Sequence, residues 1–250
     1  MTTTAPKNSP NIGAIVIITI AVVINLVIAK LMAMWSYSWF PPQASSAAPY
    51  VDDLFALETG IGSFIFFGCT GVMGWGLLFN RAGKYDESDG APIEGNTKLE
   101  IIWTIIPLVT VFVIAAYTMN VNMKLQNLGP KHKYTIGTDP TALMEADPIA
   151  DVGPIDVIAR QWSWEFVYPN GVRSSELHLP VDQRVNFRLI SEDVLHSFFV
   201  PAFRLKQDII PGSIISYSLT PTKEGRFRLR DAMFARLPSS SRSVSYSSRV

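Results

Sequence analysis

The side chains that could bind a metal or carry electrons are few, and the cysteine count limits the kinds of site they can form. The sequence has 250 residues with three histidines and one cysteine, Cys69. A single thiol excludes an intrachain disulfide, a CxxC zinc site and any metal cluster that needs two thiolates. A lone histidine such as His196 is more often a hydrogen-bonded structural residue than a metal ligand.

Two tryptophans and one glutamate are the other candidates for a functional role. Trp162 and Trp164 are two residues apart, so they would share one face of a strand. Two roles stay open for these tryptophans: packing within a β-domain, and electron transfer. Glu100 follows Thr97 at the spacing of a capping box, in which both side chains satisfy free N–H groups of a helix. A titratable group at a membrane edge can also take up protons, so both interpretations of Glu100 stay open.

Three apolar runs predict membrane helices that would position these residues. The chain is 48% hydrophobic and 17% charged, with a mean hydropathy of +0.22. The runs cover residues 12–34, 60–79 and 101–119, each about the length that crosses a hydrocarbon core as a helix. The first run could instead be a cleaved secretory signal, because small residues follow it at 45–48. Two or three retained helices are therefore expected.

The distribution of cations predicts the orientation of these helices. Residues 35–59 contain no Lys or Arg, whereas Arg81, Lys84 and Lys98 follow the second run. Positive-inside reasoning places residues 80–98 in the cytoplasm. Residues 35–59 and everything after about residue 120 then lie outside, and Glu100 lies on the cytoplasmic side. The formal net charge of zero gives no reason to expect binding to nucleic acid.

From about residue 134 the pattern changes to short strands, rich in β-branched and aromatic residues and separated by turn signals such as Pro211-Gly212. This spacing predicts a small Greek-key barrel or sandwich. The Ser- and Arg-rich end is typical of a disordered tail. We therefore predict an α+β membrane protein with an anchor at 1–119, an outer domain at 120–236 and a tail at 237–250.

Three local stretches carry a specific resemblance to a known family. They are residues 94–107 (Glu-Gly-Asn-Thr-Lys-Leu-Glu-Ile-Ile-Trp-Thr-Ile-Ile-Pro), 161–168 (Gln-Trp-Ser-Trp-Glu-Phe-Val-Tyr) and 191–212, which contains His196. In this order, within residues 50–231, the chain resembles subunit II of cytochrome c oxidase. The resemblance implies a cupredoxin-like outer domain. It also implies a proton-uptake position at Glu100 and an electron-accepting position at Trp162, with Trp164 beside it.

The same resemblance implies a dinuclear copper site, of whose ligand positions this chain keeps only the first. In the family the ligands are one His, a Cys-x-Glu-x-Cys run, and a further His and Met. His196 matches the first ligand. The other positions, in order, hold Asp231, Met233, Ala235, Ser239 and Arg242. Two bridging thiolates are needed to hold the copper pair, so we expect no metal in this chain.

The function that the resemblance implies is that of a non-catalytic subunit II in a copper-less respiratory terminal oxidase, which couples electron transport to oxygen with proton translocation. It resembles the copper-less subunits of quinol oxidases and of cyanobacterial alternative terminal oxidases. Haem and copper are then expected in a partner subunit I, together with a subunit III. Membrane quinol is the expected donor rather than cytochrome c. The expected location is a bacterial plasma membrane, or a cyanobacterial plasma or thylakoid membrane. Two alternatives stay open: a truncated or frame-shifted cytochrome c oxidase subunit, and a membrane-tethered cupredoxin-like binding module.

Overall fold

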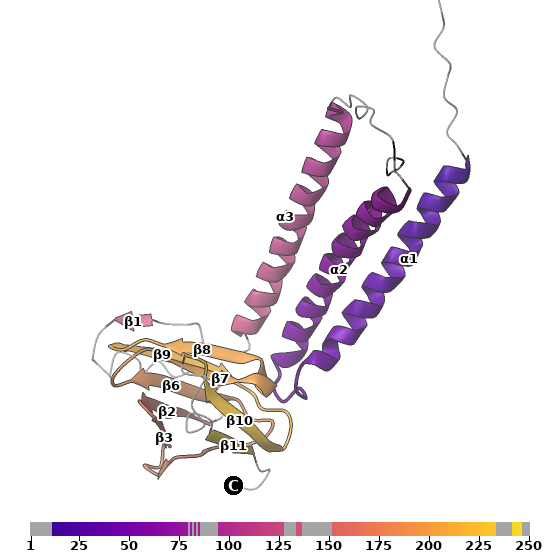
Figure 1. Cartoon of the computed structure of the whole chain (residues 1–250). Helices are drawn as coiled ribbons and strands as arrows, with labels where there is room; N and C mark the ends of the chain where they lie inside the picture. The colour runs from indigo at the N-terminus through magenta and orange to yellow at the C-terminus, as the bar shows by residue number, and fades with distance from the viewer. Residues whose placement is uncertain are drawn as a thin grey trace, which may run out of the picture. The chain divides into compact units, whose positions relative to one another are not determined.

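The computed structural model describes residues 12–79, 81, 83, 85, 95–127, 134–136, 152–233 and 242–246. Three helices precede a two-sheet β-domain (Figure 1). The chain divides into two compact units, residues 1–39 with 55–102 and residues 40–54 with 103–250. The second unit therefore contains both the β-domain and part of the connection between the first two helices. The boundaries expected from the sequence, 1–119, 120–236 and 237–250, stay a prediction.

All three apolar runs form helices long enough to cross a membrane. They are α1 (Ile12–Ser36), α2 (Ala48–Phe79) and α3 (Thr97–Asn127). Helix α2 begins twelve residues before the expected 60, because helical hydrogen bonding continues through charged residues that a search for uncharged runs leaves out. Its 32 residues span about 48 Å at 1.5 Å per residue, which exceeds the hydrocarbon core of about 30 Å.

Helices α1 and α2 contact each other where glycines allow close approach. The Asn25 side chain in α1 donates a hydrogen bond from Nδ2 to the backbone oxygen of Phe64 at 2.9 Å. A Cβ added at Gly68 would lie 3.1 Å from the same Nδ2, and one at Gly60 would lie 3.3 Å from the Cβ of Ala33. Small residues and an interhelical polar contact are what holds helices together in lipid.

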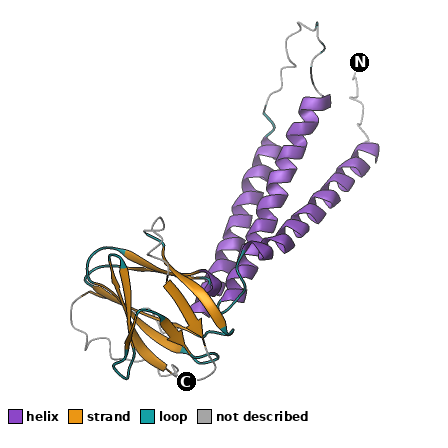
Figure 2. Ribbon diagram, turned by 60° about the horizontal axis from the view of Figure 1, so that its bottom comes forward, coloured by secondary structure: helices purple, strands orange, loops and turns teal. Residues whose placement is uncertain are grey.

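The outer domain is a sandwich of two sheets (Figure 2). The first sheet has the strand order β1-β9-β6-β2-β3-β4. Its strands are β1 (Tyr134–Ile136), β9 (Ser213–Leu219), β6 (Val185–Ser191), β2 (Val152–Arg160), β3 (Ser163–Val167) and β4 (Arg173–Ser174). The second sheet has the order β5-β11-β10-β7-β8. Its strands are β5 (Leu177–Leu179), β11 (Arg242–Tyr246), β10 (Gly225–Asp231), β7 (His196–Val200) and β8 (Leu205–Ile209).

Alternating side chains of both sheets form one core. Strand β6 buries Val185, Phe187 and Leu189, as its period of two predicts. The ring of Phe187 lies 6.0 Å from that of Phe198 in β7 of the other sheet. The expected β-domain, cupredoxin-like in its two-sheet form, is therefore confirmed.

One part of the expected tail differs from the prediction. Arg242–Tyr246 forms β11, which pairs antiparallel with β10 and parallel with β5. A strand between two others gains its stability from backbone hydrogen bonds, which do not depend on the polar composition that favoured disorder. Residues 234–241 and 247–250 lie outside the described part of the chain.

The connection between α1 and α2 is built into the outer domain. The N–H of Ala44 donates to the oxygen of Ala202, and the N–H of Ser46 donates to the oxygen of Thr220. Asp52 binds the guanidinium of Arg204 through both carboxylate oxygens, at 2.6 and 2.9 Å, with both side chains almost fully buried. The connection and the outer domain therefore lie on the same side of the membrane, as the distribution of cations predicts.

Candidate functional site

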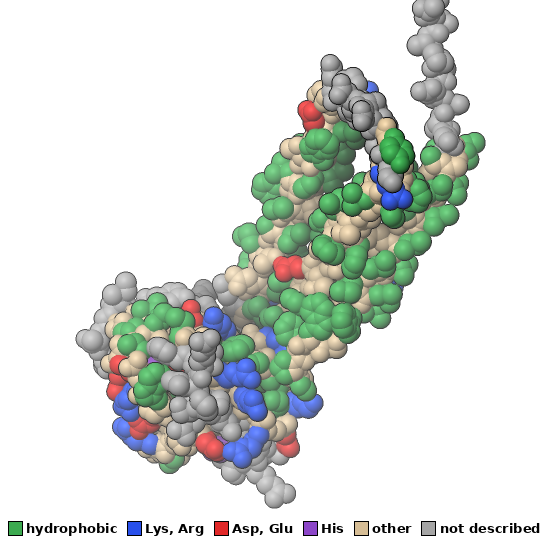
Figure 3. Space-filling model, viewed as in Figure 1, with side chains coloured by type: hydrophobic (Ala, Val, Ile, Leu, Met, Phe, Trp, Pro, Cys, Tyr) green, Lys and Arg blue, Asp and Glu red, His purple; other side chains and the backbone are tan. Residues whose placement is uncertain are grey.

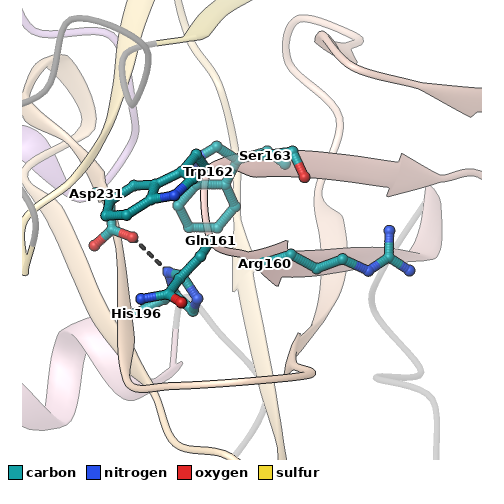
Figure 4. A pocket seen from close by; sticks show the side chains of 7 residues that line it. Arg160, Gln161, Trp162, Ser163, His196 and Asp231 are labelled. Carbon is teal, nitrogen blue, oxygen red and sulfur yellow. Dashed lines mark hydrogen bonds and ion pairs between the residues drawn. The ribbon is translucent and has the colours of Figure 1, made fainter.

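The site that would hold copper in the resembling family is occupied by an ion-paired cluster of protein side chains. Three chain segments meet there: the turn between β2 and β3, the turn that leads into β7, and the end of β10. His196 is the first residue of β7 and Asp231 is the last residue of β10. Figure 4 shows both side chains beneath the turn that carries Trp162.

Each ring nitrogen of His196 faces a carboxylate. Its Nδ1 lies 2.6 Å from Oδ2 of Asp231, and its Nε2 lies 2.7 Å from Oδ1 of Asp193. The side chains of His196 and Asp231 are 3% and 5% exposed. An ionised carboxylate can only accept hydrogen bonds, so the ring of His196 is held between two acceptor groups.

The two carboxylates also tie down the backbone of all three segments. Oδ1 of Asp231 accepts the N–H groups of Ser197 and Met233, each at 3.0 Å. Oδ2 of Asp193 accepts the N–H of Gln161 at 2.6 Å. Desolvation alone would raise the pKa of Asp193, but the hydrogen bonds from Gln161, His196 and Val194 outweigh it and lower this pKa to about 2.

The two tryptophans lie in different surroundings. Trp162 belongs to the turn between β2 and β3 and is 49% exposed, whereas Trp164 lies in β3 and is 5% exposed. The expectation that they share one face of a strand is therefore wrong, because the strand alternation begins only at Ser163. Trp164 packs edge-on against the ring of His196, with centroids 6.0 Å apart. Packing explains Trp164, and the electron-accepting position of Trp162 stays a prediction.

Ion pairs link the strands on either side of the turn that carries Trp162. Arg160 binds Glu192 and Glu165, and Arg173 binds Glu165 at 2.8 Å. The hydrogen bonds from Arg173 and then Arg160 lower the pKa of Glu165 below its usual value. The two arginines and two glutamates of these pairs carry no net charge together.

The residues present do not fit a dinuclear copper centre. Both nitrogens of His196 are taken by carboxylates, and the first thiolate position is the carboxylate of Asp231, with both oxygens already bound. Met233, at the Glu position, is 46% exposed. Within the described residues there is no group of three or more His, Cys, Asp or Glu side chains that could hold a metal ion. Ala235 and Ser239 lie outside the described residues, and Arg242 is described only as part of β11.

Glu100 lies in the first turn of α3 and is exposed, but the helix cap is not the expected one. The side-chain oxygen of Asn96 accepts the N–H groups of Lys98 and Leu99, at 3.1 and 3.3 Å. Asn96 is therefore the N-cap, and Thr97 is the first helical residue. The capping box expected from Thr97 and Glu100 is wrong by one position, because Asn, itself a strong N-cap residue, stands immediately before Thr97.

Sequence reasoning missed the two aspartates as partners of His196. Asp231 was recognised only as a missing thiolate, and Asp193 was not singled out. The spacing of Asp193 and His196, three residues apart before a strand, was the one local signal available. The pairing of His196 with Asp231 joins residues 35 apart and could not be read from either segment alone.

Known proteins match both units of the chain. The family model described as "Cytochrome C oxidase subunit II, transmembrane domain" matches residues 32–121, and "Cytochrome C oxidase subunit II, periplasmic domain" matches residues 172–232. The chain is 34% identical to cytochrome c oxidase subunit 2 of a Synechocystis species over 231 residues, which cover 80% of this chain and 68% of that protein. It is 33% identical to cytochrome c oxidase subunit 2 of Thermostichus vulcanus over 223 residues, covering 74% and 68%. Quinol oxidase subunit 2 of Bacillus subtilis is 27% identical over 157 residues, covering 62% and 44%.

Proposed function

The chain belongs to the cytochrome c oxidase subunit II family, and we propose that it serves a terminal oxidase that works without the dinuclear copper of that subunit. Membership makes it an integral membrane subunit of a haem-copper oxidase, with its C-terminal domain on the periplasmic side. The proposed electron donor is a membrane quinol. In this proposal haem and copper reside in subunit I, a subunit III completes the complex, and no redox group resides in this chain.

The His196–Asp231 pair is the observation that carries the proposal. A copper pair needs two bridging thiolates and the free lone pair of an imidazole nitrogen. Here the first thiolate position is a carboxylate bound to Nδ1 of His196 at 2.6 Å, and Nε2 is bound to Asp193. The only cysteine, Cys69, lies within α2. The site is therefore closed by its own charges rather than left with spare donors for a metal.

Without this relay, cytochrome c would have no metal on the subunit to reduce. A quinol dissolved in the bilayer can instead deliver electrons directly to subunit I. The relatives do not decide the donor, since those reported include both cytochrome c oxidase subunits and a quinol oxidase subunit. The donor assignment rests on the ligand positions of this chain.

Glu100 is the proposed proton-uptake residue. It lies in the first turn of α3, the end assigned to the cytoplasmic side, and its side chain is exposed. Asn96 caps the helix, so Glu100 does not form a capping box with Thr97. A carboxylate at the membrane edge can collect protons and release them into the partner subunit.

The test is oxygen consumption by the complex purified through this subunit, normalised to its haem content. We expect turnover with a short-chain quinol, and turnover with reduced cytochrome c that is lower by at least about tenfold. Rapid oxidation of cytochrome c would overturn the donor assignment. A complex that carries haem but is inactive with both donors would favour the damaged-subunit alternative. If no haem-bearing subunit co-purifies, the tethered binding module becomes the better explanation.

A further inference from the structure

The outer face of the second sheet carries a row of arginines along β10. Side chains alternate along this strand, so that Phe227, Leu229 and Asp231 point inward and are buried or half-buried. The residues between them are exposed on the other side of the sheet. These are Arg226, Arg228 and Arg230.

The neighbouring strands extend this row across the sheet. Arg230 pairs in register with Phe199 of β7, and Phe199 pairs with Lys206 of β8. Residues directly opposite in antiparallel strands point to the same face, so half-buried Phe199 lies between two exposed cations. We call Arg226, Arg228, Arg230, Lys206 and Phe199 the basic face. Figure 3 shows Lys and Arg side chains gathered over the part of the outer domain where Figure 1 places β10.

The arginines of the first sheet are arranged differently. Arg160, Arg173 and Arg188 each bind a carboxylate, and Arg188 does so at 2.5 and 2.6 Å from the two oxygens of Asp156. These cations are explained by their partners within the domain.

On the basic face, only one of the four cations forms an ion pair among the described residues. Arg226 binds Glu176 at 2.9 Å. Among the described residues, no ion pair joins Arg228, Arg230 or Lys206 to a carboxylate, and the nearby Asp208 accepts a hydrogen bond from Ser197. Alternate positions on a strand are about 7 Å apart, so these like charges repel each other. Such a row does not help the fold, which indicates a role in binding.

We propose that the basic face docks an acidic surface of a partner protein on the outer side of the membrane. The guanidinium groups match carboxylates in two-point hydrogen bonds, and a half-buried aromatic ring surrounded by polar groups is typical of a protein interface. Anionic lipid is the alternative occupant, and the experiment below distinguishes it from a protein. The partner is thus defined by clustered Asp and Glu side chains.

Zero-length cross-linking tests this proposal with the full chain in its native membranes. A water-soluble carbodiimide joins the amine of Lys206 directly to a carboxylate in contact with it. We expect mass spectrometry to find Lys206 joined to an Asp or Glu of another protein. In 1 M salt the screening length falls to about 3 Å, and the yield should fall with it.

The triple variant Arg226→Ser/Arg228→Ser/Arg230→Ser removes the three arginines of β10 but keeps the Lys206 amine. It should lower the yield of this cross-link about tenfold or more. Arg173→Ser, which removes an exposed arginine from the other sheet, should leave it unchanged. The proposal would be overturned if Lys206 were joined only to carboxylates of its own chain, or if the triple variant left the yield unchanged. Arginine-dependent binding to phosphatidylglycerol vesicles without any cross-link to a protein would also overturn it, in favour of lipid.

Discussion

Replacing Asp231 by Ala should destabilise the outer domain by an amount that the structure allows us to bound. The substitution removes the partner of Nδ1 of His196 and the acceptor of two backbone N–H groups. Removing one member of a buried ion pair typically costs about 3–5 kcal/mol. The N–H of Ser197, a residue with no exposed surface, also loses its acceptor, but His196 keeps Asp193 as its second partner. The total should therefore stay near about 3–5 kcal/mol.

A loss of this size lowers the folding equilibrium constant by a factor of about 100 to 5,000. Denaturant unfolding of the full chain in detergent, followed by tryptophan fluorescence, measures it, because Trp164 packs against His196. Asp231→Asn keeps an acceptor for the backbone and should lose less. Asp208→Ala removes an exposed carboxylate that accepts one hydrogen bond, from Ser197, and should cost about 1 kcal/mol. If Asp231→Ala unfolds at the same denaturant concentration as Asp208→Ala, the cluster does not hold the three segments together.

Three other predictions concern pH, protons and orientation. The folded-state pKa of Asp193 is about 2, below its ordinary value of 3.8, so its contribution to stability is present above about pH 4 and lost as the pH falls toward 2. Asp193→Asn should flatten the acid limb of the stability curve, and an unchanged limb would refute this role. Glu100→Gln should slow oxygen turnover per haem. Asn96→Ala should leave turnover normal and cost only about 0.5–2 kcal/mol of helix stability. Equal turnover in both variants would count against proton uptake by Glu100. In a background free of native cysteine, an outside-only thiol reagent should label a cysteine at Ser175 and not one at Ala82, and the reverse pattern would invert the topology.

The membrane helices and the β-domain were predictable because each follows from a local regularity. Uncharged runs predict helices at membrane length, and the alternation in β6 predicts that Val185, Phe187 and Leu189 are buried, although Asn186 between them is buried too. Helix α2 extends beyond its predicted start because charge excludes residues from lipid but not from a helix. Strand β11 was missed for a related reason, since its composition says little about backbone pairing.

The site was predictable only as a set of missing ligands. The sequence shows that Asp231 cannot bridge copper, yet it does not show that this carboxylate lies against Nδ1 of His196. It also gives no sign that Arg204 binds Asp52, because 152 residues separate them. Turn geometry was equally inaccessible, and for that reason Trp162 was wrongly placed on the face of Trp164.

The absence of a dinuclear copper centre is tested most directly by the copper content of the whole chain, purified on its own after exposure to copper. The whole chain is needed, because residues 40–54 belong to the same compact unit as the outer domain. We expect no stoichiometric copper after removal of loosely bound metal and no near-infrared absorption band of a mixed-valence pair. Two copper ions per chain with such a band would contradict it.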